Sequence, residues 1–197
     1  MQSGIALFGG SFDPVHIGHL FIVEEVRYAL GIERVFFVPA YQPPHKNEAP
    51  QASTKERMAM LECALRERPG CSVLDWEINR GGRSYTIDTV ERALEQYPGM
   101  AKPKLIIGDD LCADFGSWHQ AERLLQLVEL VIVTRGGSVT SDIIKEYNLV
   151  DNSPLPVSSS DIRERIAAGR NYRDLVPQAV YHYIEENGLY RSSLAKE

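Results

Sequence analysis

Short apolar runs alternate with segments of helical periodicity along nearly the whole chain. The runs carry no polar alternation, which is typical of strands buried on both faces of a sheet. A repeated order of strand, helix, strand implies parallel pairing through right-handed crossovers. We therefore expect an α/β fold, a Rossmann-like doubly wound parallel sheet with flanking helices, in a single domain over residues 1–197. The expected strands are 5–8, 34–39, 72–76, 104–107, 130–134 and 148–150, and the expected helices are 20–30, 54–68, 86–96, 119–126, 160–168 and 177–187.

Charge and composition exclude several classes of protein. The chain carries 21 basic and 27 acidic residues, a net charge of -6, which argues against a protein that coats nucleic acid polymers. No run approaches the length of a membrane span, and the first residues lack the pattern of a secretory leader. The cysteines are odd in number and form no C-x-x-C pair, which argues against disulfides and zinc sites and favours the cytoplasm. The oligomeric state stays open, a homo-oligomer included.

The string after the first expected strand, GGSFDPVHIGH at residues 9–19, carries the most chemistry. In a doubly wound sheet, ligands bind beyond the carboxyl ends of the strands. The glycines permit a sharp turn, and the start of the next helix attracts anions. His16 and His19 have the spacing of one helix face, and Gly18 between them would leave room for a large ligand. The plainer alternative is a glycine-rich turn with Asp13 as a helix cap and two surface histidines.

This string resembles the H-x-G-H signature of the nucleotidylyltransferase superfamily, and the chain resembles its nicotinate (or nicotinamide) mononucleotide adenylyltransferases over essentially its whole length. The resemblance implies that His16 and His19 are catalytic. It also implies an ATP site, with Mg²⁺ accompanying the ATP and no dedicated metal ligands. We assign to that ATP site the residues Gly9, Gly10, Ser11, Phe12, Gly18, Gly108, Asp110, Ser158, Ser159 and Arg163.

Later strings extend the resemblance. The string VSSSDIR at 157–163 resembles a second signature that binds the ATP phosphates, and Ser159 or Ser160 can also cap a helix there. The string SYTIDT at 84–89, where Ser84 could be a helix cap, resembles a motif that binds the pyridine carboxylate or amide. By position, the resemblance implies a pyridine-nucleotide site made by Lys46 of a P-P-H-K loop, Tyr85, Thr86, Trp118 and Arg135. Asp109 departs from the small residue expected in the G-x-D element.

The function we expect is adenylyl transfer from ATP to nicotinate mononucleotide, which gives deamido-NAD and pyrophosphate. No serine or cysteine lies beside a base in these strings, so direct transfer without a covalent intermediate is expected. The preference for nicotinate follows from resemblance to the compact bacterial enzymes, and the nicotinamide form stays an alternative. Transfer to phosphopantetheine, a noncatalytic nucleotide sensor and a fragment of a class I aminoacyl-tRNA synthetase are the rival interpretations.

Overall fold

The centre of the protein is a parallel sheet. We describe the fold from a computed structural model, which covers residues 4–43, 49–99, 101–134, 139–151 and 155–191. The sheet has six strands in the order β3-β2-β1-β4-β5-β6, and every neighbouring pair is parallel. The predicted doubly wound fold is therefore confirmed. The strands are β1 (Ile5–Gly10), β2 (Arg34–Pro39), β3 (Cys71–Val73), β4 (Lys104–Gly108), β5 (Glu129–Thr134) and β6 (Asn148–Asp151).

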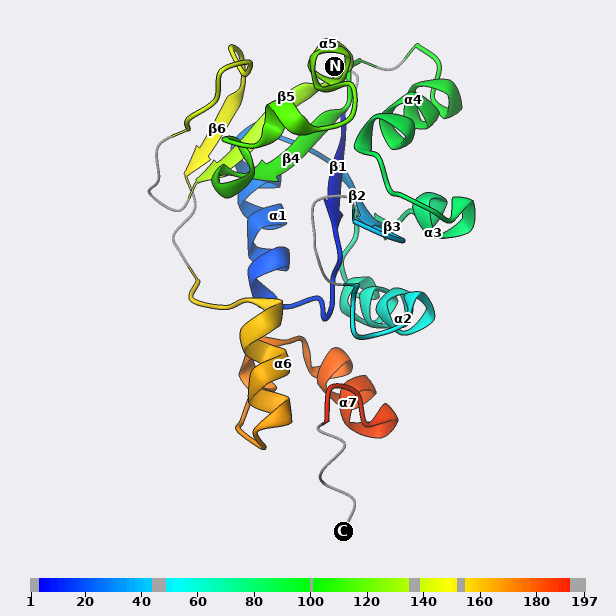
Figure 1. Ribbon diagram of the computed structural model, residues 1–197, viewed down its shortest axis with the longest axis vertical. Helices are drawn as coiled ribbons and strands as arrows, with labels where there is room; N and C mark the ends of the chain where they lie inside the picture. Colours follow the sequence, from blue (N-terminus) through cyan, green and yellow to red (C-terminus); the bar gives the residue numbers. More distant parts are fainter. Residues whose placement is uncertain (1–3, 44–48, 100, 135–138, 152–154, 192–197) are drawn as a thin grey trace.

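Helices cover both faces of this sheet. They are α1 (Ile17–Leu30), α2 (Thr54–Leu65), α3 (Trp76–Arg80), α4 (Thr86–Gln96), α5 (Ala121–Leu127), α6 (Ser159–Ala167) and α7 (Gln178–Asn187). Figure 1 shows α1 on one side of β1 and both α3 and α4 on the other. No helix of the described ranges is long and apolar enough to cross a membrane.

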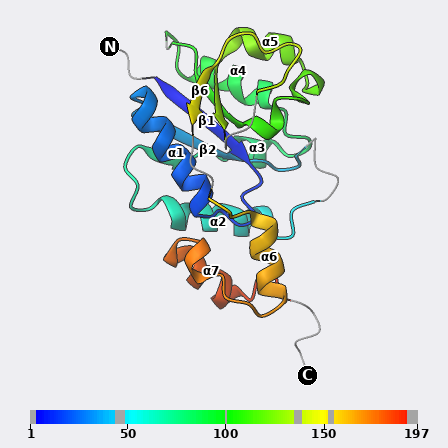
Figure 2. The same cartoon turned by 90° about the vertical axis from the view of Figure 1, so that its left-hand side faces the viewer.

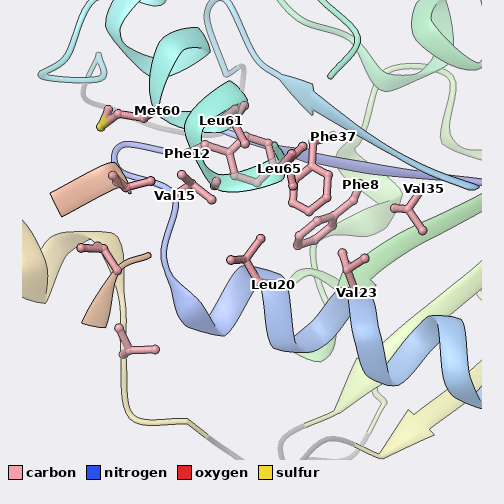
Figure 3. Close-up of a cluster of buried hydrophobic side chains, with 14 of the residues drawn as sticks. Phe8, Phe12, Val15, Leu20, Val23, Val35, Phe37, Met60, Leu61 and Leu65 are labelled. Carbon is pink, nitrogen blue, oxygen red and sulfur yellow. The ribbon is translucent and has the colours of Figure 1, made fainter. Parts of the chain in front are cut away.

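The core consists of two apolar layers, because successive strand residues point to opposite faces. Ala6 and Phe8 of β1 join the layer with α1, α2, α6 and α7, and Figure 3 shows part of it. Ile5 and Leu7 join the layer with α4 and α5. Burial on both faces explains why these strands read as continuous apolar runs.

Several predicted elements were wrong at their ends. The helix expected from residue 20 begins at Ile17, and the helix expected to end at residue 68 ends at Leu65. The third strand was expected at 72–76, but β3 is the three-residue segment Cys71–Val73, and Trp76 begins the short helix α3, which was not predicted. The fifth helix was expected from His119, but Gln120 has a φ of 52° and α5 begins at Ala121. Left-handed backbone at Gln120 cannot belong to a right-handed helix, so the chain turns there first.

The last two helices lie beyond the carboxyl ends of the strands. Figures 1 and 2 show α6 and α7 together past the end of the sheet at which α1 begins. Hydrogen bonds from α6 to the loop between β1 and α1 hold that arrangement. Three strand ends, those of β2, β1 and β4, lie next to one another at this edge, which we call the carboxyl edge.

Candidate active site

The carboxyl edge changes direction between β1 and β4. The chain leaves β1 for α1 on one face, and β4 is followed by α5 on the other. Open parallel sheets bind ligands at such a switch point. A Cβ atom on Gly9, near the end of β1, would meet no other atom within 4 Å. The space beside Gly9 at the end of β1 is therefore not filled by other described parts of the protein.

Phe12 anchors the turn that follows Gly10. Its φ is 50°, in the left-handed region, and its side chain is 1% exposed. The ring lies 5.6 Å from that of Phe37 and 5.1 Å from that of His19, and Figure 3 shows it between α1 and α2. A Cβ on Gly10 would lie 3.0 Å from the Phe12 ring. Phe12 therefore packs inside the protein, and only its main chain can face a nucleotide.

His16 and His19 lie together at the start of α1. Their ring centroids are 3.7 Å apart. His16 is the N-cap residue and is 5% exposed, and its main-chain N–H donates to Nδ1 of His19 at 3.2 Å. When Nδ1 of a neutral imidazole accepts a hydrogen bond, the ring proton is on Nε2, so Nε2 of His19 is a donor. The first turn of α1 contains no acidic residue, which leaves the positive end of the helix dipole available to an anion.

The space beside Gly18 is occupied by the protein itself. A Cβ on Gly18 would lie 3.0 Å from Nδ1 of His16 and 3.0 Å from Cγ1 of Val157. The prediction that this glycine leaves room for a ligand was therefore wrong. Its missing side chain lets the segment before α6 approach the start of α1.

That approach brings the second predicted nucleotide motif to the first. Oγ of Ser159 donates to the carbonyl of Pro14 at 2.9 Å, across 145 residues of sequence. Nη1 of Arg163 donates to the carbonyl of Asp13 at 2.7 Å and lies 3.7 Å from its carboxylate. The helix cap is Ser158, which accepts from the N–H of Asp161 at 3.1 Å. Ser159 or Ser160 had been expected to cap α6. That expectation was wrong, because the helix already includes both residues.

Asp13 holds the turn from a second direction. It is 4% exposed, and its carboxylate accepts from the main-chain N–H of Gln51 at 2.8 Å and of Ala52 at 3.0 Å. The hydroxyl of Tyr190 donates to the same carboxylate at 2.9 Å. Burial and this carboxylate raise the pKa of Tyr190. Asp13 is therefore an anchor between distant segments, and the alternative of a cap for α1 was wrong.

Arg57 supports the turn from below and was missed by the sequence analysis. It lies on α2 and is 1% exposed, and its Nη1 donates to the carbonyl of Ser11 at 2.8 Å. Burial lowers the pKa of Arg57, and the neighbouring Asp13 and Tyr190 partly offset that effect. The signal was the register of α2. Its buried stripe runs through Arg57, Met60 and Leu61, so Arg57 takes a core position on the helix.

The end of β4 supplies the third side of this group. A Cβ on Gly108 would collide with Oδ1 of Asp110, so only glycine allows that carboxylate to fold back over the strand end. Asp110 is exposed at the edge. The carboxylate of Asp109 accepts from Oγ1 of Thr134 at 2.9 Å. Asp109, which replaces the small residue expected at this position, thereby connects the end of β4 to the end of β5.

Aromatic side chains gather farther along the carboxyl edge. The N-cap of α4 is Tyr85, and Thr86 is its first residue, so the expected Ser84 cap was wrong. The ring centroid of Tyr85 lies 4.4 Å from that of His119. Trp118 is partly buried and stacks on Phe115 with ring centroids 4.8 Å apart.

Hydrogen bonds connect the aromatic group to the turn after β1. The N–H of Ala40 donates to the carbonyl of Gly10 at 2.9 Å. The next residue, Tyr41, donates its N–H to Oγ of Ser84 at 2.9 Å. The structure thus brings most of the predicted residues to one edge. Lys46 and Arg135 lie outside the described residues.

Comparison with known proteins identifies the family. The family model described as cytidylyltransferase-like matches residues 7–165. A probable nicotinate-nucleotide adenylyltransferase from Bacillus mycoides is 41% identical over 191 residues, which cover 95% of this chain and 98% of that protein. One from Borreliella burgdorferi is 39% identical over 186 residues, or 94% of this chain and 96% of that protein. This chain belongs to the nicotinate-nucleotide adenylyltransferase family.

A solved structure of low sequence identity has the same fold. It is the Plasmodium falciparum nicotinic acid mononucleotide adenylyltransferase complexed with NaAD. The two chains superpose with a TM-score of 0.79 at 21% identity, over 95% of this chain and 97% of that one. The fold of the nicotinate-nucleotide adenylyltransferase family is therefore the fold described above.

A cavity also lies at the opposite end of the sheet. Its volume is about 460 Å³, and its lining includes Lys102, Glu129 and Asn148. These residues precede or begin β4, β5 and β6, so the cavity lies at the amino ends of the strands. It contains none of the predicted site residues, and ligands of this family's fold bind at the other end of the sheet.

Proposed function

We propose that the carboxyl edge transfers the adenylyl group of ATP to nicotinate mononucleotide, releasing pyrophosphate and forming deamido-NAD. The observation that carries this proposal is the contact between the two nucleotide motifs, through Ser159 on Pro14 and Arg163 on Asp13. That contact gathers two imidazoles, a guanidinium and two helix starts at one strand end. Such a set of donors suits the oxygens of a triphosphate.

The chemistry we propose is a direct displacement. An oxygen of the 5′-phosphate of the mononucleotide attacks the α-phosphorus of ATP and forms the new P–O bond. The bond from that phosphorus to the α,β-bridging oxygen breaks, and pyrophosphate leaves. His16 and His19 donate hydrogen bonds where negative charge increases on the phosphoryl oxygens. The close ring pair supports this role, because both imidazoles lie at the start of α1, where an anion is favoured.

The ATP site we propose has two walls. One is the main chain of residues 9–12, reinforced from within the protein by Phe12 and Arg57. The other is the start of α6, where Ser158, Ser159 and Arg163 meet the phosphates. Gly108 and Asp110 at the end of β4 would face the ribose, whose hydroxyls can donate hydrogen bonds to the Asp110 carboxylate.

The pyridine site we propose lies at the start of α4. The first N–H groups of a helix have no partner within the helix, so those at Thr86 can meet the carboxylate of the nicotinate ring. Tyr85 and Trp118 offer flat apolar surfaces on which that ring can stack. Lys46 and Arg135 complete the proposed site from segments outside the described residues.

We propose that Mg²⁺ enters as part of the substrate Mg–ATP. Among the described residues, no group of three His, Cys, Asp or Glu side chains is arranged to hold a metal ion. Mg²⁺ readily keeps several waters and binds through substrate phosphates with one or two carboxylates.

The three cysteines are free thiols, which suits a reducing compartment, and we propose that the protein works in the cytoplasm.

A pyrophosphate-release assay tests the function. Each reaction contains the protein, ATP, Mg²⁺ and one acceptor. The acceptors, tested in separate reactions, are nicotinate mononucleotide, nicotinamide mononucleotide and phosphopantetheine. We expect the fastest release with nicotinate mononucleotide, and none after EDTA removes the divalent cation. Release only with phosphopantetheine would overturn the proposal. No release with any acceptor, together with measurable ATP binding, would favour a nucleotide sensor.

A further inference from the structure

A buried carboxylate lies beneath the proposed pyridine site. Glu77 on α3 is 7% exposed, and the proposed chemistry gives it no role. Oγ1 of Thr89, on α4, donates to Oε1 of Glu77 at 2.7 Å. The Ser84 side chain is near enough to favour the charged form of Glu77. Burial raises the pKa of Glu77, and the Thr89 and Ser84 hydroxyls act in the opposite direction.

Ser84 also forms hydrogen bonds with the segment after β2. Its Oγ accepts from the N–H of Tyr41 at 2.9 Å. Its own N–H donates to the carbonyl of Gln42 at 3.0 Å, and Gln42 pairs with Arg83 in an isolated parallel bridge. Glu77 therefore connects two segments that belong to different parts of the sequence. One leads from β2 into the P-P-H-K loop, and the other begins α4.

We propose that Glu77 is a positioning residue for the pyridine mononucleotide, acting through Ser84 and Thr89 on the main chain at Tyr85 and Thr86. This inference rests on the proposed function and names a determinant of its second substrate. A carboxylate is costly to bury, and hydrogen bonds to a charged acceptor are stronger than those between neutral groups. Glu77 thus gives the start of α4 a fixed position that neutral packing would not supply.

The contacts of Glu77 predict which substrate is affected. Its partners Ser84 and Thr89 belong to the segment 84–89, and Ser84 bonds to residues 41 and 42. The turn at residues 9–19 is held instead by Arg57, Arg163 and Tyr190. Loss of Glu77 should therefore weaken the use of the pyridine mononucleotide and leave the use of ATP unchanged.

Steady-state kinetics of four variants test the inference. For Glu77→Ala and Ser84→Ala, we expect the KM for nicotinate mononucleotide to rise roughly tenfold, the size expected for a lost hydrogen bond to a charged group. The KM for ATP and kcat should change less than about twofold. Glu77→Gln keeps an oxygen that can accept from Thr89 and should restore most of the affinity. Asn79→Ala, an exposed position on the same helix, is the matched control and should behave as wild type.

The double variant Glu77→Ala, Ser84→Ala separates positioning from simple destabilisation. If Glu77 acts through Ser84, the two changes are not additive, and the double variant resembles either single variant. An unchanged KM for nicotinate mononucleotide in Glu77→Ala and Ser84→Ala, or an equal rise for both substrates in Glu77→Ala, overturns the inference alone. A wild-type protein that releases no pyrophosphate with nicotinate mononucleotide overturns the proposed function, and the inference falls with it.

Discussion

The two halves of the candidate site are built in different ways. The phosphate half, residues 9–19 and 158–163, is held by hydrogen bonds to main-chain carbonyls from Arg57, Ser159 and Arg163. The pyridine half, residues 84–86 and 118–119, is held by the contact of Tyr85 with His119 and by Glu77 underneath. Charged side chains from two helices, α2 and α6, thus hold the first half, whereas the second depends on rings and one carboxylate.

This difference suggests a division of labour. Fixed donors stabilise charge as it develops, so a change in the phosphate half should lower turnover. Stacking surfaces and helix N–H groups bind the ring alike before and during reaction, so a change in the pyridine half should raise KM. The predictions below test the contrast, beginning with the largest effect.

His19→Ala should give the largest loss. Its Nε2 is the proposed donor to the reacting phosphoryl group, and removing one such donor costs on the order of 10²–10³ in kcat. Single-turnover kinetics with saturating substrates would measure this, because product release then does not mask chemistry. The KM for either substrate should change little.

The matched control for that variant is His182→Ala. His182 is exposed on α7, where Gln178 is its hydrogen-bond neighbour. It should keep wild-type turnover and unfolding temperature. Near-wild-type turnover in His19→Ala would remove His19 from the chemistry and leave the phosphate half with a binding role only.

Arg57→Met should give the second-largest effect, a decrease in the free energy of unfolding. Methionine fills similar space without the guanidinium, so the carbonyl of Ser11 loses its donor and Asp13 loses a nearby positive charge. A buried polar group left without a partner costs about 1–3 kcal/mol. Urea unfolding would measure the loss. Lys55→Met, exposed on the same helix, should unfold as wild type does, and equal stability of both variants would contradict the support assigned to Arg57.

The sheet was predictable and its supports were not. The four inner strands, β1, β2, β4 and β5, were recognisable because burial on both faces makes most of each one an apolar run. The short helix α3 was missed, because five residues contain too little of the helical period to be read. In the sequence Arg57 and Glu77 resemble ordinary surface charges, since their partners Ser11 and Thr89 lie on other elements.

The caps show the same limit at closer range. The strings that contain His16, Ser84 and Ser158 were recognised as helix starts, but only His16 and Ser158 are caps, and neither was the expected one. A motif defines which residues occur together. The cap depends on which N–H each side chain can reach, and Ser84 reaches instead for Tyr41, in a segment that the motif does not include.

The smallest effect is a pH dependence of stability at Glu77. Its pKa in the folded protein lies above the ordinary value of 4.5 because burial disfavours the charged form. The folded state therefore binds the proton more tightly than the unfolded state, and the contribution of Glu77 to stability falls as pH rises through these values. Glu77→Gln does not titrate. Thermal unfolding from pH 4 to pH 7 should show the wild type losing stability relative to this variant as pH increases. A difference in unfolding temperature that does not change with pH would mean that folding leaves the pKa of Glu77 unchanged. Since the phosphate half contains no part of this network, kcat at pH 7 should be the same in both proteins.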